Sequence, residues 1–277
     1  NGPVWYVDAS SELPYANGSE SAKFSKIQYG INAAAAGDTV LVTAGTYTEN
    51  INFDGKNIAV IGADRETTII AAEVAGSVVT FSNGESSDAV LKGFTLQNGS
   101  GDYGGGMYLT NSDPTITNVI ISGNTTSNNG GGMYLNVSDP TITNVTISGN
   151  TTSNNGGGMY TQASNPTLTN VTISGNTANQ LGGGIYCWNN SNPILLNTII
   201  AGNESNEIEF SSVNDSSTIT ISYSNIEGGQ DSIVTNDNGT ITWGDGNVEI
   251  DPLFVDADNG NYNLLASSQL INAGHPG

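Results

Sequence analysis

The sequence predicts an all-β protein folded as a single parallel solenoid. Two observations predict this fold: a glycine triplet that recurs at a fixed interval, and short apolar runs between the triplets. The triplets begin at residues 104, 130, 156 and 182, so each repeat is 26 residues long, and the fourth carries one extra residue. A fixed period of this size is typical of solenoids, in which each repeat buries its apolar face against its neighbours.

Within each repeat the apolar residues alternate with polar ones and show no helical spacing. The runs "MYL", "TIT" and "VTIS" are β-branched or aromatic and are bounded by Gly, Pro, Asn and Ser, so they predict three short strands per coil. Helical solenoids need longer periodic apolar stretches, and propeller blades need more residues. The remaining architecture is a parallel β-helix, with equivalent strands stacked about 4.8 Å apart.

Alternation along each strand assigns the side chains to faces. In the "MYL" strand the Met or Ile after each triplet points into the core, and the Tyr that follows points outward. Two asparagines per repeat occupy the bends, where stacked amides can hydrogen-bond along the solenoid axis and tolerate turn conformations. These asparagines are Asn118, Asn144, Asn170 and Asn197 at one bend, and Asn124, Asn150, Asn176 and Asn203 at the next.

The ends of the chain differ from the repeats. Phe24, Ile27 and Ile31 have helical spacing and predict a short helix that covers the N-terminal end of the core. We expect one domain over 1–277, with a cap at 1–38, degenerate coils at 39–103 and four repeats at 104–207. Late coils follow at 208–248, and an irregular closing segment at 249–277.

The charge of the chain excludes several classes of partner. The net charge is −21 with only five Lys and Arg, and no basic residue follows Lys92. Binding to nucleic acid or to an anionic membrane needs clustered basic residues, so neither is expected. The single cysteine, Cys187, excludes an internal disulfide and a cysteine-based zinc site. No apolar run is long enough to span a membrane.

Three stretches resemble a known group of proteins. They are "WYVDAS…FSKIQYGINAAAAGDTVLVTAGTYTENI", the repeat "SGNTTSNNGGGMY", and "YSNIEGG…IDPLFVDADNGNYNLLASSQLINAG". Together they resemble right-handed parallel β-helix proteins of the pectate-lyase-like superfamily, and the repeats resemble those of polymorphic outer-membrane and autotransporter proteins. The resemblance implies right-handed coiling and a secreted or surface-displayed bacterial module, monomeric and part of a larger surface protein. It implies little about activity, because the superfamily includes lyases, hydrolases, adhesins and binding modules.

The residues argue against catalysis. Members of the superfamily that cleave uronates use Arg or Lys on the first parallel sheet, whereas that row here holds tyrosines and uncharged residues, and the only histidine is His275. A glycosidase needs two facing carboxylates. Asp113 and Asp139 align one coil apart, but asparagines replace them in the next two repeats, which is typical of a turn position. No catalytic residue is therefore expected, and a polysaccharide lyase or glycosidase remains the alternative.

The outward tyrosines are the first candidate for binding. Four rings at one-coil spacing would form an aromatic strip on which sugar rings could stack. The alternative is that the rings stack on one another beneath the neighbouring turn loops. The predicted glycan-binding residues are Tyr108, Tyr134, Tyr160, Tyr186, Trp188, Asn136 and Gln162.

Two further surfaces remain open. Outward T-x-T pairs recur at Thr115/Thr117, Thr141/Thr143 and Thr167/Thr169 and resemble the flat threonine ranks of ice-binding solenoids. No cofactor is expected apart from a possible Ca²⁺ ion, because oxygen ligands are dense near the C-terminus. The predicted calcium ligands are Asp245, Asp251, Asp256 and Asp258. The expected function is a non-catalytic module for adhesion or extracellular glycan contact.

Overall fold

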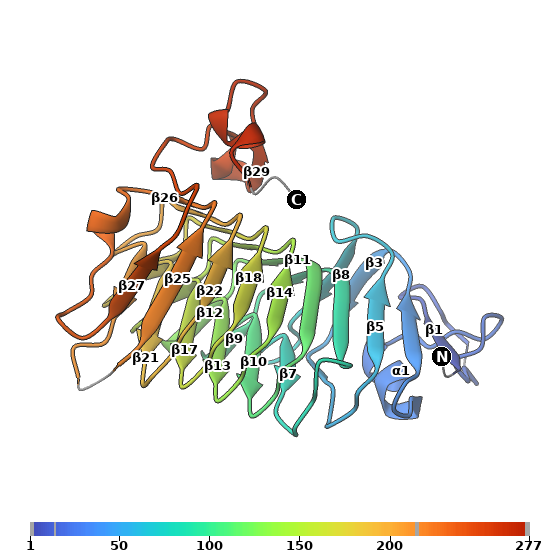
Figure 1. The fold of residues 1–277 in the computed structure, drawn as a ribbon. Helices are drawn as coiled ribbons and strands as arrows, with labels where there is room; N and C mark the ends of the chain where they lie inside the picture. Colours follow the sequence, from blue (N-terminus) through green and yellow to red (C-terminus); the bar gives the residue numbers. More distant parts are fainter. Residues whose placement is uncertain (1–2, 14, 214–215, 275–277) are drawn as a thin grey trace.

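The computed structural model describes residues 3–13, 15–213 and 216–274. The chain winds into a parallel β-solenoid of about eight turns, with one short helix near the N-terminus, as predicted (Figure 1). The described residues form three parallel sheets along the solenoid and one antiparallel hairpin outside it.

The largest sheet contains the "TIT" and "VTIS" runs of every repeat, which form two walls of the solenoid. Its first wall has the order β1 (Val4–Val7), β2 (Thr39–Val42), β5 (Ala59–Gly62), β8 (Val90–Gln97), β11 (Thr115–Ser122), β14 (Thr141–Thr143), β18 (Thr167–Thr169), β22 (Ile194–Leu196), β25 (Thr218–Ser222) and β27 (Thr240–Trp243). The second wall adds β3 (Gly45–Thr48), β6 (Thr68–Ala71), β15 (Thr146–Ser148), β19 (Thr172–Ser174), β23 (Ile199–Ala201) and β26 (Asn225–Ile226).

The other two parallel sheets complete each coil. The "MYL" sheet contains β4 (Ile51–Asn52), β7 (Val79–Phe81), β10 (Met107–Thr110), β13 (Met133–Asn136), β17 (Met159–Gln162), β21 (Ile185–Trp188) and β24 (Ile208–Phe210). The sequence predicted turns where the last sheet lies, because the "TTSNN" run has too few apolar residues to indicate a strand. That sheet contains β9 (Ser100–Tyr103), β12 (Thr125–Asn129), β16 (Thr151–Thr152) and β20 (Thr177–Ala178).

Equivalent residues of successive repeats pair directly with one another. Met107 pairs with Met133, and Met133 with Met159, so the 26-residue period is also the register of the sheets. Every one of these methionines is fully buried, as are Ile116 and Ile142 on the next wall. The predicted inward faces are therefore confirmed, and they form one continuous hydrophobic core.

Helix α1 (Ile27–Ala33) covers the N-terminal end of this core with Ile27 and Ile31, as predicted. Two side chains from the first coils hold its ends. The carboxylate of Glu49 accepts hydrogen bonds from the backbone N–H groups of Ile27 and Gln28, at 2.8 and 3.0 Å. The ammonium of Lys56 donates to three carbonyls at the helix C-terminus, where a cation is favoured. In the described part of the chain, no helix has the length and apolar character needed to cross a membrane.

The two asparagine positions have different roles. Asn118, Asn144 and Asn170 adopt positive φ angles of 54°, 55° and 56° at the bend between the first two walls. A positive φ is strained for most residues, and asparagine tolerates it. Asn150 instead points into the core, where it is fully buried. Its amide donates 2.9 Å hydrogen bonds to the Asn176 side chain and to the Ile121 carbonyl, and its oxygen accepts from the amide of Asn124 at 3.0 Å.

The glycine triplets are required by backbone geometry. Gly130 has a φ of +71°, and a Cβ on Gly131 would lie 2.6 Å from the carbonyl oxygen of Gly157 in the next coil. The first glycine therefore turns the chain, and the second allows two coils to approach.

The buried asparagine ladder ends at a carboxyl group. Asn203 donates its backbone and side-chain N–H groups to Glu207, which is 8% exposed. Burial, together with the neighbouring Glu227 carboxyl, raises the pKa of Glu207 to about 7. A buried, protonatable side chain therefore terminates this hydrogen-bonded column.

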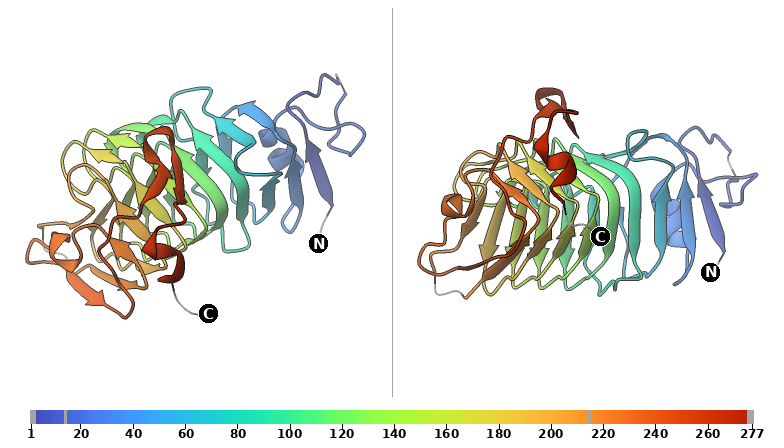
Figure 2. Two further views of the ribbon diagram at one scale, coloured as in Figure 1. Left: turned by 90° about the horizontal axis from the view of Figure 1, so that it is seen from above. Right: turned by 45° about the horizontal axis from the view of Figure 1, so that its top comes forward.

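The C-terminal segment does not continue the solenoid. It folds back and lies along the outside of the second wall, over the coils drawn in yellow and green (Figure 2). The segment consists of the antiparallel strands β28 (Phe254–Asp256) and β29 (Asn261–Leu264) and the 3-10 turns η2 (Ala257–Asn259) and η3 (Gln269–Asn272); a third turn, η1 (Gln230–Ser232), precedes it. This arrangement differs from the expected closing segment at the end of the coils.

We predict that the asparagine ladder is a major source of stability. Asn150→Leu should lower the free energy of unfolding by about 3 kcal/mol or more, because it leaves several buried donors and acceptors unpaired. Asn144→Gly is the matched control, with an expected change of about 1 kcal/mol or less, since glycine adopts the same positive φ. Urea denaturation measures both changes, and equal losses in the two variants would contradict the prediction.

We also predict that Glu207 makes stability depend on pH. Its folded-state pKa is raised above the usual value of 4.5 to about 7, so the protonated form favours the folded state. This contribution should be complete below pH 4.5, decline as the pH rises toward 7, and be absent above it, a total loss of about 3 kcal/mol. The difference between wild-type protein and Glu207→Gln in urea denaturation should show this trend, and a difference that is constant from pH 4 to 8 would refute it.

Candidate functional site

The four predicted tyrosines form a stacked ladder on the outside of the "MYL" sheet. Successive ring centroids from Tyr108 to Tyr134, Tyr160 and Tyr186 are 5.5, 5.3 and 5.4 Å apart, and the rings are within 16° of parallel. Because the strands pair in register, each ring lies directly above the last. The ladder is therefore continuous over four coils.

The ladder is covered rather than open. Tyr134, Tyr160 and Tyr186 are only 9%, 4% and 6% exposed, and burial raises the pKa of Tyr134 to about 12. The ring of Tyr103 from β9 packs at a tilt on Tyr134, with ring centroids 4.9 Å apart, and Leu181 from the loop after β20 also packs on the ladder. The rings thus present little surface on which a sugar could stack.

The polar residues predicted beside the tyrosines are half-buried and bonded within the same sheet. The hydroxyl of Tyr134 donates to Gln162 at 3.1 Å, and the amide of Asn136 donates to Thr110 at 3.2 Å. Trp188 packs against Tyr160, with ring centroids 6.5 Å apart. The structure brings all seven predicted residues together, but their contacts are largely with one another.

The two aspartates considered for catalysis form part of a turn ladder. A carboxylate oxygen of Asp113 accepts from the backbone N–H of Asp139 at 2.7 Å, and Asp139 accepts in the same way from Asn165 at 2.6 Å. Asparagine continues the pattern at Asn192. The Asp or Asn at this position therefore links the turn of each repeat to the turn of the next. His275 lies outside the described residues.

The four predicted calcium ligands do not form one site. Asp256 accepts hydrogen bonds from Asn259 at 3.0 and 2.9 Å, and Asp251 accepts from the backbone of Leu253. Asp245 follows β27, whereas Asp256 ends β28 and Asp258 belongs to the η2 turn. Within the described residues, no three His, Cys, Asp or Glu side chains lie close enough together to hold a metal ion.

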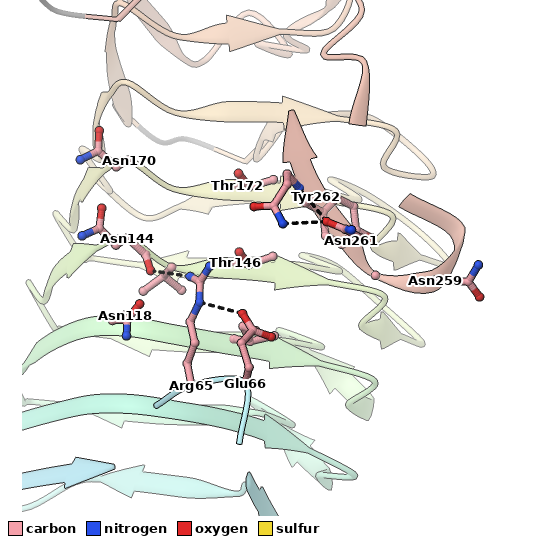
Figure 3. Close-up of a pocket in the computed structure, with 14 residues that line it drawn as sticks. Arg65, Glu66, Asn118, Asn144, Thr146, Asn170, Thr172, Asn259, Asn261 and Tyr262 are labelled. Atoms are coloured by element: carbon pink, nitrogen blue, oxygen red, sulfur yellow. Dashed lines mark hydrogen bonds and ion pairs between the residues drawn. The ribbon is translucent and has the colours of Figure 1, made fainter. Parts of the chain in front are cut away.

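A site that the sequence did not predict lies between the C-terminal hairpin and the second wall of the solenoid. It is a groove of about 780 Å³, which we call the hairpin groove (Figure 3). Its size is within the range of small-ligand sites. Its polar lining residues are Arg65, Glu66, Asn118, Asn144, Thr146, Asn170, Thr172, Asn259, Asn261, Tyr262 and Asn263.

The solenoid supplies the floor of the hairpin groove. Asn118, Asn144 and Asn170 form a column along one edge, because each occupies the same positive-φ bend one coil further on (Figure 3). Thr146 and Thr172 pair in register beside them. The floor therefore repeats amide and hydroxyl groups at the spacing of the coils, about 4.8 Å.

Arg65 forms the end of the hairpin groove nearest the N-terminus. Its guanidinium donates to the carbonyl of Asn144 at 3.3 Å and to the Glu66 carboxylate at 3.1 Å. The Arg65 side chain is 28% exposed and the Glu66 side chain 63%. The structure thus holds this cation against a bend 79 residues away in the chain.

Tyr262 supplies the aromatic surface of the hairpin groove. Its hydroxyl hydrogen-bonds with Ser148 on the second wall, and burial raises its pKa. It also lies over Gly175, where a Cβ would come within 3.2 Å of the Tyr262 oxygen. The ring meets Phe254 edge-on at 5.2 Å, so the hairpin itself holds its orientation.

The sequence contains weak signals of this groove. Arg65 is one of only five basic residues, and the stretch "NGNYNL" combines asparagines with an aromatic residue. Neither signal shows that the two segments meet, because the hairpin contacts coils more than 80 residues earlier in the chain.

The family to which the chain belongs has the fold that the structure shows. The chain belongs to the right-handed β-helix family, since it matches the description "Right handed beta helix region" over residues 57–177 and 128–251, which confirms the predicted handedness. A pectin methylesterase from carrot is similar in structure at 13% identity, with a TM-score of 0.54 over 88% of this chain and 89% of that one. Pectate lyase Pel9A has 17% identity and a TM-score of 0.45, over 99% and 92%. At these identities the likeness concerns the fold alone, and no curated protein matches the chain.

Proposed function

We propose that this member of the right-handed β-helix family is a non-catalytic module, secreted or displayed on a bacterial surface, that contacts extracellular glycans through the hairpin groove. The observation that carries the proposal is the convergence in one groove of an aromatic ring, several amides, hydroxyl groups and a guanidinium. Sugars offer C–H faces that pack on aromatic rings, and hydroxyls that exchange hydrogen bonds with amides.

The charge of the protein favours an uncharged glycan. The net charge of −21 repels polyuronates, and Arg65 is already paired with Glu66. The floor column of Asn118, Asn144 and Asn170 instead supplies neutral donors and acceptors along the solenoid axis. A linear neutral polysaccharide lying along that axis would meet similar groups at each coil.

The groove is better suited to binding than to hydrolysis. Glycoside hydrolysis ordinarily needs two carboxyl groups on opposite sides of the scissile bond. Among the described residues that line the groove, Glu66 alone carries a carboxylate, and it is exposed and ion-paired with Arg65. The surface location is supported by the resemblance of the repeats to those of polymorphic outer-membrane and autotransporter proteins.

The proposal predicts a specific effect of Tyr262. On a panel of immobilised neutral polysaccharides, Tyr262→Ala should weaken binding about tenfold, because it removes the ring against which the sugar packs. Tyr29→Ala is the control, since this residue is 50% exposed on helix α1 and does not line the groove, so the substitution should leave binding unchanged.

The same panel tests for enzymatic activity. Release of new reducing ends or unsaturated products would replace the proposal with the enzyme alternative. Equal affinity of wild-type protein and Tyr262→Ala would place any glycan contact elsewhere.

One observation favours ice binding as a second candidate function. Thr115, Thr141 and Thr167 pair in register on neighbouring strands of the first wall, as does the parallel row that begins with Thr117. All of these side chains are half-exposed or exposed. The rows are then interrupted by Ile194 and Leu196, which limits the regular array to three strands.

If the threonine rows bind ice, the protein should produce thermal hysteresis. Thr143→Tyr should then abolish it, because a bulky ring in the middle of the array prevents flat contact. Thr242→Tyr, an exposed substitution beyond the interruption, should leave it intact. The absence of thermal hysteresis in the wild-type protein would exclude this candidate.

A further inference from the structure

The column of bend asparagines in the hairpin groove differs from the other amide rows of the solenoid. In the buried ladder, the Asn150 amide donates to the Asn176 side chain at 2.9 Å. In the turns that follow β16 and β20, the amide of Gln180 donates to the side chain of Asn154 at 2.8 Å. In both of these rows, amides that repeat from coil to coil bond to one another along the solenoid axis.

The bend asparagines are not paired in this way. Within the described residues, the side-chain amides of Asn118, Asn144 and Asn170 form no hydrogen bond (Figure 3). Asn144 and Asn170 are exposed, Asn118 is half-buried, and all three line the hairpin groove. Each amide offers two N–H donors and a carbonyl acceptor. The groove therefore presents one unpaired amide at each of three successive coils.

The backbone fixes the spacing of these amides. The N–H of Asn144 donates to the carbonyl of Thr169 at 3.1 Å, and the N–H of Asn170 donates to the carbonyl of Leu196 at 3.0 Å. The bends are thus hydrogen-bonded from coil to coil as the strands are, which places neighbouring bends about 4.8 Å apart. A ligand that repeats at this distance would meet an equivalent amide at each step.

A second cavity continues the groove by one bend. It measures about 240 Å³ and is lined by Asn170 and Asn197 of the solenoid and by Leu264, Leu270 and Ile271 of the C-terminal segment. Asn197 occupies the next positive-φ bend, with a φ of 51°. Because Asn170 lines both cavities, they adjoin along the column, and together they extend over four bends.

Among neutral glycans, a β-1,4-linked glucan or mannan has the matching repeat. Its glycosidic bonds are equatorial at both ends of each ring, so the chain is a flat, extended ribbon that advances by nearly one coil spacing with each sugar. Successive sugars turn over, but both edges of the ribbon carry hydroxyl groups, and an amide can donate to or accept from either edge. Chains with α-1,4 or β-1,3 linkages curl, and they lose register with a straight column of amides.

We infer that the hairpin groove binds an extended β-1,4-linked glucan or mannan along the solenoid axis, with one sugar residue at each bend and room for four. This inference rests on the proposed function and adds the linkage and the conformation of the glycan. The edge of each sugar bonds with one bend asparagine, and the face of one ring packs on Tyr262. Selectivity for the extended chain follows from the stacking of the coils, since that stacking fixes the distance between the amides.

Tetrasaccharides that differ in the configuration of their linkages test the inference. Calorimetric titration of the protein should give an affinity for cellotetraose about tenfold or more above that for maltotetraose, because only the β-linked chain reaches every bend. The β-1,4-linked mannotetraose is titrated alongside to distinguish a mannan from a glucan. A preference for either β-linked chain over maltotetraose supports the inference.

Chain length provides a readout that adhesion without register would not give. The affinity for the preferred β-1,4-linked series should rise about fivefold with each sugar from the disaccharide to the tetrasaccharide, since each sugar adds roughly one hydrogen bond to a neutral amide. It should then level off, because the column has four bends. An affinity that does not depend on length between two and four sugars would overturn the inference.

The amide at the centre of the column can be removed without changing the backbone. Asn144→Gly keeps the positive φ of this bend and should lower the affinity for the preferred tetrasaccharide about fivefold. Asn98→Gly is the matched control, because Asn98 is exposed, has a φ of 65° and does not line the groove, so the affinity should not change. Equal affinities of the two variants would overturn the inference, and urea denaturation of both shows that each is folded.

The outcomes separate the inference from the proposed function. Binding of maltotetraose as tightly as both β-linked tetrasaccharides would overturn the inference and leave the proposed glycan contact standing. The same conclusion would follow if a polysaccharide on the panel bound while neither β-linked tetrasaccharide did. A protein that bound no tetrasaccharide and no polysaccharide would overturn both proposals.

Discussion

The structure depends on one constraint, which is that each buried polar group at a bend must find its partner in the next coil. Asn124, Asn150 and Asn176 are fully buried and bond to one another through their side chains. A shift of one residue in any coil would break these contacts and leave amides unsatisfied in the core. The 26-residue period is therefore a hydrogen-bonding register as much as a hydrophobic one, and the tyrosine ladder, the threonine rows and the bend column all follow from it.

The candidate site lies between the coils, which follow this register, and the C-terminal segment, which does not. The solenoid provides a straight column of amides at Asn118, Asn144 and Asn170, and the C-terminal hairpin adds Tyr262 above them. The regular bends of the solenoid and the irregular hairpin above them enclose a groove that runs along the solenoid axis. Two cavities that share Asn170 lie along it, and they differ in chemistry because the C-terminal segment lines one with polar residues of the hairpin and the other with Leu264, Leu270 and Ile271.

The tyrosines show what the alternation of side chains along a strand can predict and what it cannot. It correctly predicted that Tyr134 and Tyr160 leave the core, because side chains alternate along a strand. It did not predict their exposure, since that depends on what packs outside the sheet. Tyr103 and Leu181 cover the rings, and they belong to β9 and to the loop after β20, where the sequence had indicated only turns. An outward side chain on a solenoid is therefore not automatically a surface side chain.

The sequence by itself determined the solenoid, its inward faces, its asparagine bends and the helix over its N-terminal end, because repetition, alternation and helical spacing are local properties of the sequence. The tertiary structure alone decided that Arg65 reaches the carbonyl of Asn144, that Tyr262 bonds with Ser148, and that the last segment lies beside the coils instead of closing them. These contacts join residues about 80 to 115 positions apart in the chain. No period relates such residues, so only the packing of the complete chain brings them together.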